Sequence, residues 1–263
     1  MKILLTNDDG IYADGLWALA KELREVGEIL VVAPDREQSA VGTSVTLHQP
    51  LRIKKINPLI SGIETYSVEG TPADSVILGL KLVAGDGIDL VISGINAGLN
   101  MGNDVFISGT VGAALQGSFY ETPAIAISSE MVDSGARFDV AAMIGKLLVR
   151  KIQQKALHPK SLLNVNVPSV PLERICGVEL TRLGKRDYRD DISKGNDGKR
   201  DYYWIVRSEP KWREVEGTDI WAIRQHRVSI TPLRVNLTDS TKLHPLEELC
   251  SSLSLELRPE DGC

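Results

Sequence analysis

Two adjacent carboxylates, Asp8 and Asp9, directly follow an apolar run at the start of the chain, and Gly10 comes next. Neighbouring carboxylates raise each other's proton affinity unless a cation lies between them. Oxygen ligands without His or Cys suit a hard cation such as Mg²⁺ or Mn²⁺. In an ordinary turn one acid caps the next helix and the other faces water. The position directly after a buried strand favours a metal site instead.

Neutral oxygens could complete the metal site, and a helix start could add an anion site beside it. Ser39 and Asn96 follow two further expected strands and could complete a metal's coordination, although each alone is commonly a turn or cap residue. Ser108, Gly109 and Thr110 stand directly before an expected helix, where free N–H groups and the helix dipole attract anions. Capping alone would also select Ser or Thr there. Together these residues predict a hard-metal site beside an anion site.

Other catalytic arrangements find no support in the sequence. The four histidines (His48, His158, His226 and His244) are scattered, which argues against a histidine metal site or a Ser-His-Asp triad. The first expected strand is followed by Asn-Asp-Asp-Gly rather than a GxGxxG dinucleotide fingerprint, and the chain has no P-loop motif. A Rossmann dehydrogenase and a P-loop NTPase are therefore disfavoured.

If the bound anion is a phosphate ester, the spacing of the two acids separates two possible chemistries. Phosphatases of the haloacid dehalogenase type use an Asp-x-Asp motif, in which the first Asp attacks phosphorus. Here Asp8 and Asp9 are adjacent, and Gly10 occupies the second position after Asp8. A bent turn would bring both acids to one cation, which suits ligation better than covalent attack. We therefore predict attack by a metal-activated water, with no phospho-aspartate.

Alternating strands and helices must position these residues. The sequence predicts a doubly wound, mostly parallel α/β sheet of Rossmann-like type over the first 170 or so residues. Ligands of such sheets bind at the carboxyl ends of the strands. The expected strands are 2–6, 28–34, 88–93, 124–128 and 162–167, and the expected helices lie within 14–27, 72–83, 111–120 and 138–153.

Two regions depart from this rhythm. Residues 43–67 alternate around a proline and predict an antiparallel excursion from the main sheet. From about residue 177 short alternating runs flank a charged loop at 182–200, followed by a tail with an apolar helical stripe at Leu243, Leu246, Leu249 and Leu253. We expect a catalytic core at 1–175 and, at 176–263, a β-hairpin-rich extension and helical tail used for oligomerisation.

Composition limits the classes of protein. The 263 residues are 43% hydrophobic and 25% charged with a net charge of −5, which fits a globular protein and provides no broad basic field for nucleic acid. Three cysteines without CxxC spacing disfavour a disulfide framework and indicate a reducing compartment. No stretch reaches the roughly 18 apolar residues of a membrane helix. We expect a soluble cytoplasmic protein that binds neither membranes nor, stably, nucleic acid.

Four separate motifs strongly resemble the SurE family, and they occur in the family's order. They are Leu5–Gly10 (LTNDDG), Ala33–Ser39 (APDREQS), Ser93–Gly98 (SGINAG) and Ser108–Ala114 (SGTVGAA), and the resemblance extends at least to Pro168. It implies a metal-dependent phosphatase for nucleoside 5′- and 3′-monophosphates, with some activity on short polyphosphate. It also implies one Mg²⁺ or Mn²⁺ per subunit and a homodimer or homotetramer formed through the C-terminal region.

The same resemblance assigns roles to the candidate residues. Asp8, Asp9, Ser39 and Asn96 would hold the metal, whereas Ser108, Gly109 and Thr110, with Asn96, would hold the phosphate. Asp8, Asp9 and Asn96 would then be the catalytic residues, with Asp9 the better proton acceptor. Two other hypotheses remain open. The site could be a nucleotide or phosphate sensor without turnover, or the α/β part could be a scaffold for a partner-binding C-terminal module.

Overall fold

The computed structural model describes residues 1–85, 87–133, 135–154, 158, 161–187, 190–207 and 211–257. The chain forms two compact units, Met1–Leu233 and Arg234–Cys263. The first unit contains the sheet and all of the candidate site residues. The described part of the second unit contains a short 3-10 turn (Ser240–Lys242) and helix α6 (Leu243–Glu256). No helix among the described residues combines the length and apolar character needed to cross a membrane.

The first unit is built on a nine-stranded sheet with the order β10-β15-β9-β6-β5-β1-β2-β4-β3. All neighbours from β9 to β4 pair in parallel, whereas β15 is antiparallel to β9 and β3 is antiparallel to β4. The predicted mostly parallel α/β sheet is therefore confirmed. Its strands are β1 (Lys2–Thr6), β2 (Glu28–Pro34), β3 (Ile53–Lys55), β4 (Glu64–Val68), β5 (Leu90–Ala97), β6 (Ala124–Ser129), β9 (Leu162–Val167), β10 (Val178–Leu180) and β15 (Val228–Leu233).

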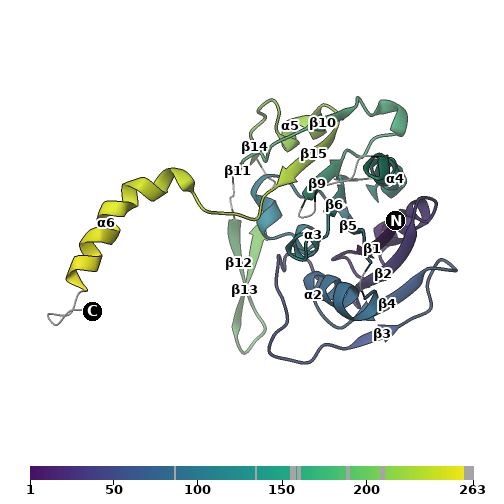
Figure 1. The fold of residues 1–263 in the computed structure, drawn as a ribbon, viewed down its shortest axis with the longest axis horizontal. Helices are drawn as coiled ribbons and strands as arrows, with labels where there is room; N and C mark the ends of the chain where they lie inside the picture. The colour runs from purple at the N-terminus through teal and green to yellow at the C-terminus, as the bar shows by residue number, and fades with distance from the viewer. Residues whose placement is uncertain are drawn as a thin grey trace. The chain divides into compact units, whose positions relative to one another are not determined.

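Helices cover both faces of the sheet (Figure 1). Side chains alternate between the faces of a strand, so Ile3 and Leu5 pack in the core under α1 and α4, whereas Leu4 packs in the core under α2 and α3. The helices are α1 (Asp14–Leu23), α2 (Pro72–Leu78), which continues as a π-helical turn (Gly79–Val83), α3 (Gly109–Phe119), α4 (Phe138–Gln154) and α5 (Asp219–Arg224). Short 3-10 turns occupy Gly102–Phe106 and Leu172–Arg174.

The segment expected as an antiparallel excursion at 43–67 instead forms an edge of the main sheet. Strand β4 pairs in parallel with β2, and only β3 is antiparallel, to β4. The expectation was wrong about β4 because hydrogen bonding to β2 depends on a partner more than 30 residues away in sequence.

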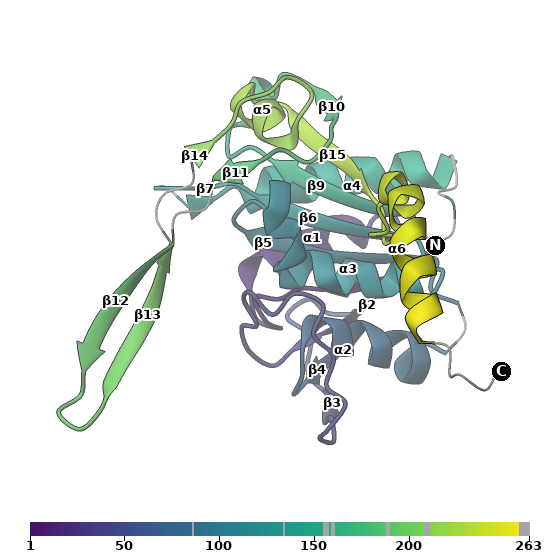
Figure 2. The ribbon, with the colours of Figure 1, turned by 90° about the vertical axis from the view of Figure 1, so that its left-hand side faces the viewer.

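The expected charged loop at 182–200 is also largely a strand. Here β12 (Asp190–Asn196) pairs with β13 (Asp201–Arg207) in one hairpin, seen at full length in Figure 2. The aromatic and β-branched residues of β13 favour extended structure, and they impose it on the polar β12 by pairing. Two shorter pairs join β11 (Arg186–Asp187) to β14 (Lys211–Trp212) and β7 (Met131–Val132) to β8 (Gly135–Ala136).

Strands β10 and β15 carry the sheet beyond residue 175. Both lie in the segment expected to be a β-hairpin-rich extension, and β15 pairs with β9. The compact unit that contains the sheet ends at Leu233.

Candidate functional site

A hollow of about 540 Å³ lies at the carboxyl ends of the central strands. It brings together Asp8, Asp9, Ser39, Asn96 and Ser108, which come from three strand ends and a helix start. The carboxyl ends of parallel strands meet at one edge of the sheet, which is why residues far apart in sequence converge there. The other lining residues are Glu37, Ala40, Ala97, Leu99, Asn100, Asp104 and Ile107.

Asp8 is the most buried carboxylate of the predicted metal ligands, with 5% of its surface exposed. Burial raises its pKa to about 6, and the charge of Asp9 adds to this effect. The hydroxyl of Thr110 donates a hydrogen bond of 2.6 Å to Asp8 Oδ1 and counteracts part of the rise. Thr110 is the side-chain donor to this buried carboxylate, so a cation bound beside Asp8 would further stabilise its ionised form.

A tight turn lets the adjacent Asp8 and Asp9 face one hollow. The side-chain amide of Asn7 donates to the carbonyl of Gly10 over 2.9 Å, and Gly10 has a φ of +100°, which favours glycine. A Cβ on Gly10 would also lie 3.0 Å from the backbone of Arg36. Burial raises the pKa of Asp9, although the backbone N–H of Ala97 donates to its Oδ2 over 3.3 Å and lowers it in part.

Asn96 and Ser39 add neutral oxygens to the hollow. Asn96 lies within β5 rather than after it, because this strand continues to Ala97 through a shift of register between Ser93 and Asn96. Its side-chain nitrogen donates to the carbonyl of Gly98 over 2.7 Å, so the amide oxygen is the atom suited to a cation. The hydroxyl of Ser39 donates to Glu37 Oε1 over 2.6 Å.

The start of α3 contributes three residues in three different ways. Ser108 lines the hollow and caps the helix, because its Oγ accepts from the backbone N–H of Val111 over 3.1 Å. Gly109 allows close packing, since a Cβ there would lie 2.8 Å from Asp8 Cβ. Thr110 is fully buried behind Asp8 and does not line the hollow. The Thr110 hydroxyl contacts Asp8, and the predicted role of Thr110 in phosphate binding stays a prediction.

Asn100 is a site residue that the sequence did not single out. Its backbone N–H donates to Asn166 Oδ1 over 2.9 Å, and its carbonyl accepts from Asn164 Nδ2 over 2.8 Å. Its own amide donates to Ser128 Oγ over 2.9 Å and to Thr110 Oγ1 over 3.4 Å. Asparagines at alternate positions of an otherwise apolar strand, LLNVNV, were the available signal for this buried network.

The charged side chains that line the hollow are all acidic. Its lining includes the carboxylates of Asp8, Asp9, Glu37 and Asp104, and no Lys, Arg or His among the described lining residues. An anion entering this hollow is repelled unless a cation is also bound. Within the described part of the chain no three His, Cys, Asp or Glu side chains cluster as a metal site. Two carboxylates with a hydroxyl and an amide oxygen form a donor set that fits a hard divalent cation.

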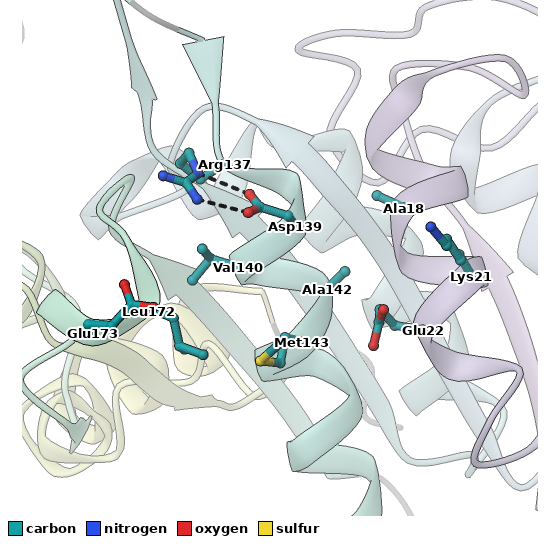
Figure 3. Close-up of a pocket in the computed structure, with 10 residues that line it drawn as sticks. All are labelled: Ala18, Lys21, Glu22, Arg137, Asp139, Val140, Ala142, Met143, Leu172 and Glu173. Atoms are coloured by element: carbon teal, nitrogen blue, oxygen red, sulfur yellow. Dashed lines mark hydrogen bonds and ion pairs between the residues drawn. The ribbon is translucent and has the colours of Figure 1, made fainter.

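A separate hollow of about 420 Å³ lies between α1 and α4 (Figure 3). Two cationic side chains, Lys21 and Arg137, line it, and Arg137 is already paired with Asp139 by two hydrogen bonds of 3.0 and 2.8 Å. Val140, Ala142 and Met143 form the apolar part of its lining. It contains none of the predicted site residues.

Comparisons with known proteins identify relatives of this chain. The family model described as "Survival protein SurE" matches residues 3–190. The chain is 50% identical over 238 residues to a protein of Dehalococcoides mccartyi named 5′-nucleotidase SurE, covering 90% of each. It is 44% identical over 263 residues to the 5′-nucleotidase SurE of Geobacter sulfurreducens, covering 100% of this chain and 97% of that protein.

A solved structure supports the same relationship. The crystal structure of the SurE protein from Aquifex aeolicus superposes with a TM-score of 0.82 at 37% sequence identity, covering 95% of this chain and 99% of that one. On sequence and on fold, this chain belongs to the SurE family.

Proposed function

We propose that this protein is a divalent-metal-dependent phosphatase that hydrolyses nucleoside 5′- and 3′-monophosphates to nucleoside and phosphate, with short polyphosphate as a further substrate. The observation that carries the proposal is a carboxylate-rich hollow directly in front of the N-terminus of α3. Such a site provides for a cation and for an anion side by side. The names of the relatives from Dehalococcoides mccartyi and Geobacter sulfurreducens support nucleotidase activity.

Asp8, Asp9, Ser39 and Asn96 are the proposed ligands of one Mg²⁺ or Mn²⁺ per subunit. The bound ion would neutralise part of the negative charge of the site, which otherwise repels the phosphate oxygens. It would also lower the pKa of a bound water. Ser108 and the backbone N–H of Gly109 are the proposed phosphate contacts at the helix start. In this proposal Thr110 positions Asp8 instead of binding phosphate.

In the proposed reaction water attacks phosphorus and gives its proton to Asp9, and the bond between phosphorus and the ester oxygen breaks as that oxygen takes up a proton from solvent to form the nucleoside hydroxyl. Each acid accepts one hydrogen bond, but the bond from Ala97 N–H to Asp9 is 3.3 Å long and the bond from Thr110 to Asp8 is 2.6 Å, so Asp9 is less engaged. Asp9 is also less buried than Asp8, which leaves it closer to incoming water. Asn96 lines the same hollow and orients the phosphate.

We further propose a homodimer or homotetramer that assembles through the C-terminal region in the cytoplasm. Exposed apolar side chains support self-association: Leu243, Leu246, Leu249 and Leu253 on α6, and Tyr202, Tyr203, Trp204 and Ile205 on β13. Cys176 and Cys250 are exposed free thiols, as a reducing compartment permits.

Phosphate release from a panel of nucleoside monophosphates tests the function, with and without Mg²⁺ or Mn²⁺. We expect metal-dependent turnover, and a loss of about 100-fold or more in Asp8→Asn and in Asp9→Asn, since each removes a charge from the site. Unchanged circular dichroism checks the fold of both variants. Nucleotide binding without turnover would favour a sensor, and full activity after removal of both acids would end the metal-site proposal.

A further inference from the structure

A second hollow, of about 450 Å³, adjoins the candidate active site. Leu99 lines both hollows. Of the next two residues, Asn100 lines the active-site hollow and Met101 lines the second hollow. One turn of backbone therefore borders both spaces.

Strand pairing explains why the two hollows are neighbours. Ala97, in the lining of the active-site hollow, pairs with Ser129 at the end of β6. The N–H of Gly98 donates to the carbonyl of Ser129 over 2.9 Å. Glu130, the next residue, lines the second hollow. Both spaces thus open along the same carboxyl edge of the sheet, where ligands of doubly wound proteins bind.

The lining of the second hollow suits a flat ring with apolar faces and a polar edge. Met101, Ile220 and Ile223 form a buried hydrophobic cluster, with Leu99 packed against it. Glu130 and Arg224 add one acceptor and one donor to this apolar lining. An apolar pocket with a few placed polar groups is the usual form of a small-molecule site.

The polar groups and the cluster are held in place before any ligand binds. Glu130 Oε2 accepts from the backbone N–H of Ser169 over 3.0 Å, and Arg224 forms an ion pair of 2.5 Å with Glu214. Asp219, the first residue of α5, connects this helix to the loop that contains Leu99 and Met101, since its Oδ2 accepts a hydrogen bond from the N–H of Gly102 over 2.8 Å. Preformed geometry lowers the entropy lost on binding.

We infer that this second hollow binds the nucleobase of the nucleotide, with the ring against Met101, Ile220 and Ile223 and its polar edge toward Glu130 and Arg224. The inference rests on the proposed nucleotidase function, which places the phosphate in the adjoining hollow. The hollow between α1 and α4 is a poorer candidate, because it shares no lining residue with the active site.

A binding measurement tests the inference without turnover. The isoleucine methyl groups of the full-length protein are observed by NMR in Mg²⁺, during titration with the non-hydrolysable phosphonate analogue of adenosine 5′-monophosphate or of ribose 5-phosphate. We expect ring-current shifts of the Ile220 and Ile223 methyls with the nucleotide and none with the base-free sugar phosphate. Nucleotide binding that leaves both methyls unmoved overturns the inference.

Kinetics supply an independent test. In Ile223→Ala and Arg224→Ala we expect kcat/KM for adenosine 5′-monophosphate to fall about tenfold or more, with that for ribose 5-phosphate within about twofold of wild type. Ile152→Ala is the matched control for Ile223→Ala, because it removes an equally apolar, buried side chain from α4, and it should keep the wild-type ratio of the two substrates. Glu214→Gln breaks the ion pair that holds Arg224, so it should lower the same ratio, but less than Arg224→Ala does.

The outcomes separate this inference from the proposed function. If Ile223→Ala and Arg224→Ala lose kcat/KM equally on both substrates, or lose none, the base binds elsewhere. The proposed phosphatase activity then still stands. Methyl shifts without any phosphate release in Mg²⁺ or Mn²⁺ support the base site and reject the nucleotidase.

Discussion

At the scale of single residues, the buried environment of Asp8 destabilises the folded protein. Its carboxyl group is buried at the end of β1, and burial raises its pKa from 3.8 to about 6. The raised pKa means that the folded protein holds this proton more tightly than the unfolded chain does. Ionised Asp8 therefore lowers the stability of the metal-free protein, and it does so fully only above pH 6.

Replacing Asp8 by Asn should stabilise the metal-free protein in a pH-dependent way. Well below pH 3.8 Asp8 is protonated in the folded and unfolded states, so the difference in free energy of unfolding between variant and wild type should be smallest at the acidic end of the range. As pH rises to 7 the variant should become more stable by an amount of order 2 kcal/mol, since the amide keeps the acceptor for Thr110 without the charge. Urea unfolding in chelator from pH 4 to 7.5 measures this difference. A constant difference would contradict a buried, shifted Asp8.

The nucleophile can be identified from the stereochemistry at phosphorus. We expect hydrolysis of a chiral phosphorothioate ester to invert the configuration at phosphorus, because one direct attack by water inverts it, whereas a phospho-aspartate requires two displacements and retains it. We expect direct attack because the turn at Gly10 directs both acids into one hollow as neighbours, an arrangement suited to holding a cation. Retention, or a phosphoryl group found on Asp8 or Asp9 by mass spectrometry of the N-terminal peptide, would establish covalent attack and leave the phosphatase proposal standing.

At the scale of elements, the contact between α3 and β1 sets the geometry of the site. The helix begins at Gly109, against Asp8 at the end of β1. Thr110 in the first turn of the same helix bonds to Asp8, and Asn100 bonds to Thr110. Beneath this contact, Asn164 and Asn166 of β9 hold the backbone of Asn100. The start of α3 thus depends on β1 and β9 for its position.

Gly109→Ala should impair the site more than the fold. The added Cβ would lie 2.8 Å from Asp8 Cβ and 2.9 Å from Asp8 Oδ2, which forces Asp8 to shift. We expect turnover to fall about tenfold or more, since sub-ångström placement of catalytic groups matters at this level. Gly145→Ala in α4 is the matched control, because its Cβ would meet the flexible end of Leu19 at a similar 2.9 Å. Equal turnover in the two variants would show that the approach of α3 to Asp8 has no role in catalysis.

At the scale of the whole molecule, exposed apolar surface concentrates in the C-terminal part. Helix α6 of the second compact unit exposes Leu243, Leu246, Leu249 and Leu253, spaced three or four residues apart. Such a stripe on one helix face is typical of a segment that packs against a partner. In the first unit the hairpin β12–β13 also exposes aromatic side chains.

Truncation before Leu243 should reduce the size of the assembled particle. Removing α6 takes away its leucine stripe and leaves the sheet of the first unit complete, because that unit ends at Leu233. Sedimentation velocity of the full chain and the truncated chain at equal concentration measures the change. An unchanged oligomer would assign self-association to another surface.

Much of the fold and most of the candidate site follow from the sequence alone. The short apolar runs that become β1, β2, β6 and β9 are local signals, because burial on both faces of a parallel strand selects nearly continuous Val, Ile and Leu. Once those strands are placed, Asp8, Asp9, Ser39 and Asn96 converge by topology, since parallel strands share one carboxyl edge. No knowledge of side-chain contacts is needed for that step.

Only the tertiary structure decided which polar groups meet. Thr110 bonds to Asp8 across 102 residues of chain, and Asn164 reaches Asn100 across 64. The strand at 190–196 and the entry of β15 into the main sheet likewise depend on partners distant in sequence. Hydrophobic periodicity reports only the burial of a residue relative to its near neighbours. Hydrogen-bond partners and strand neighbours are selected by packing between elements, so they are decided when the chain folds.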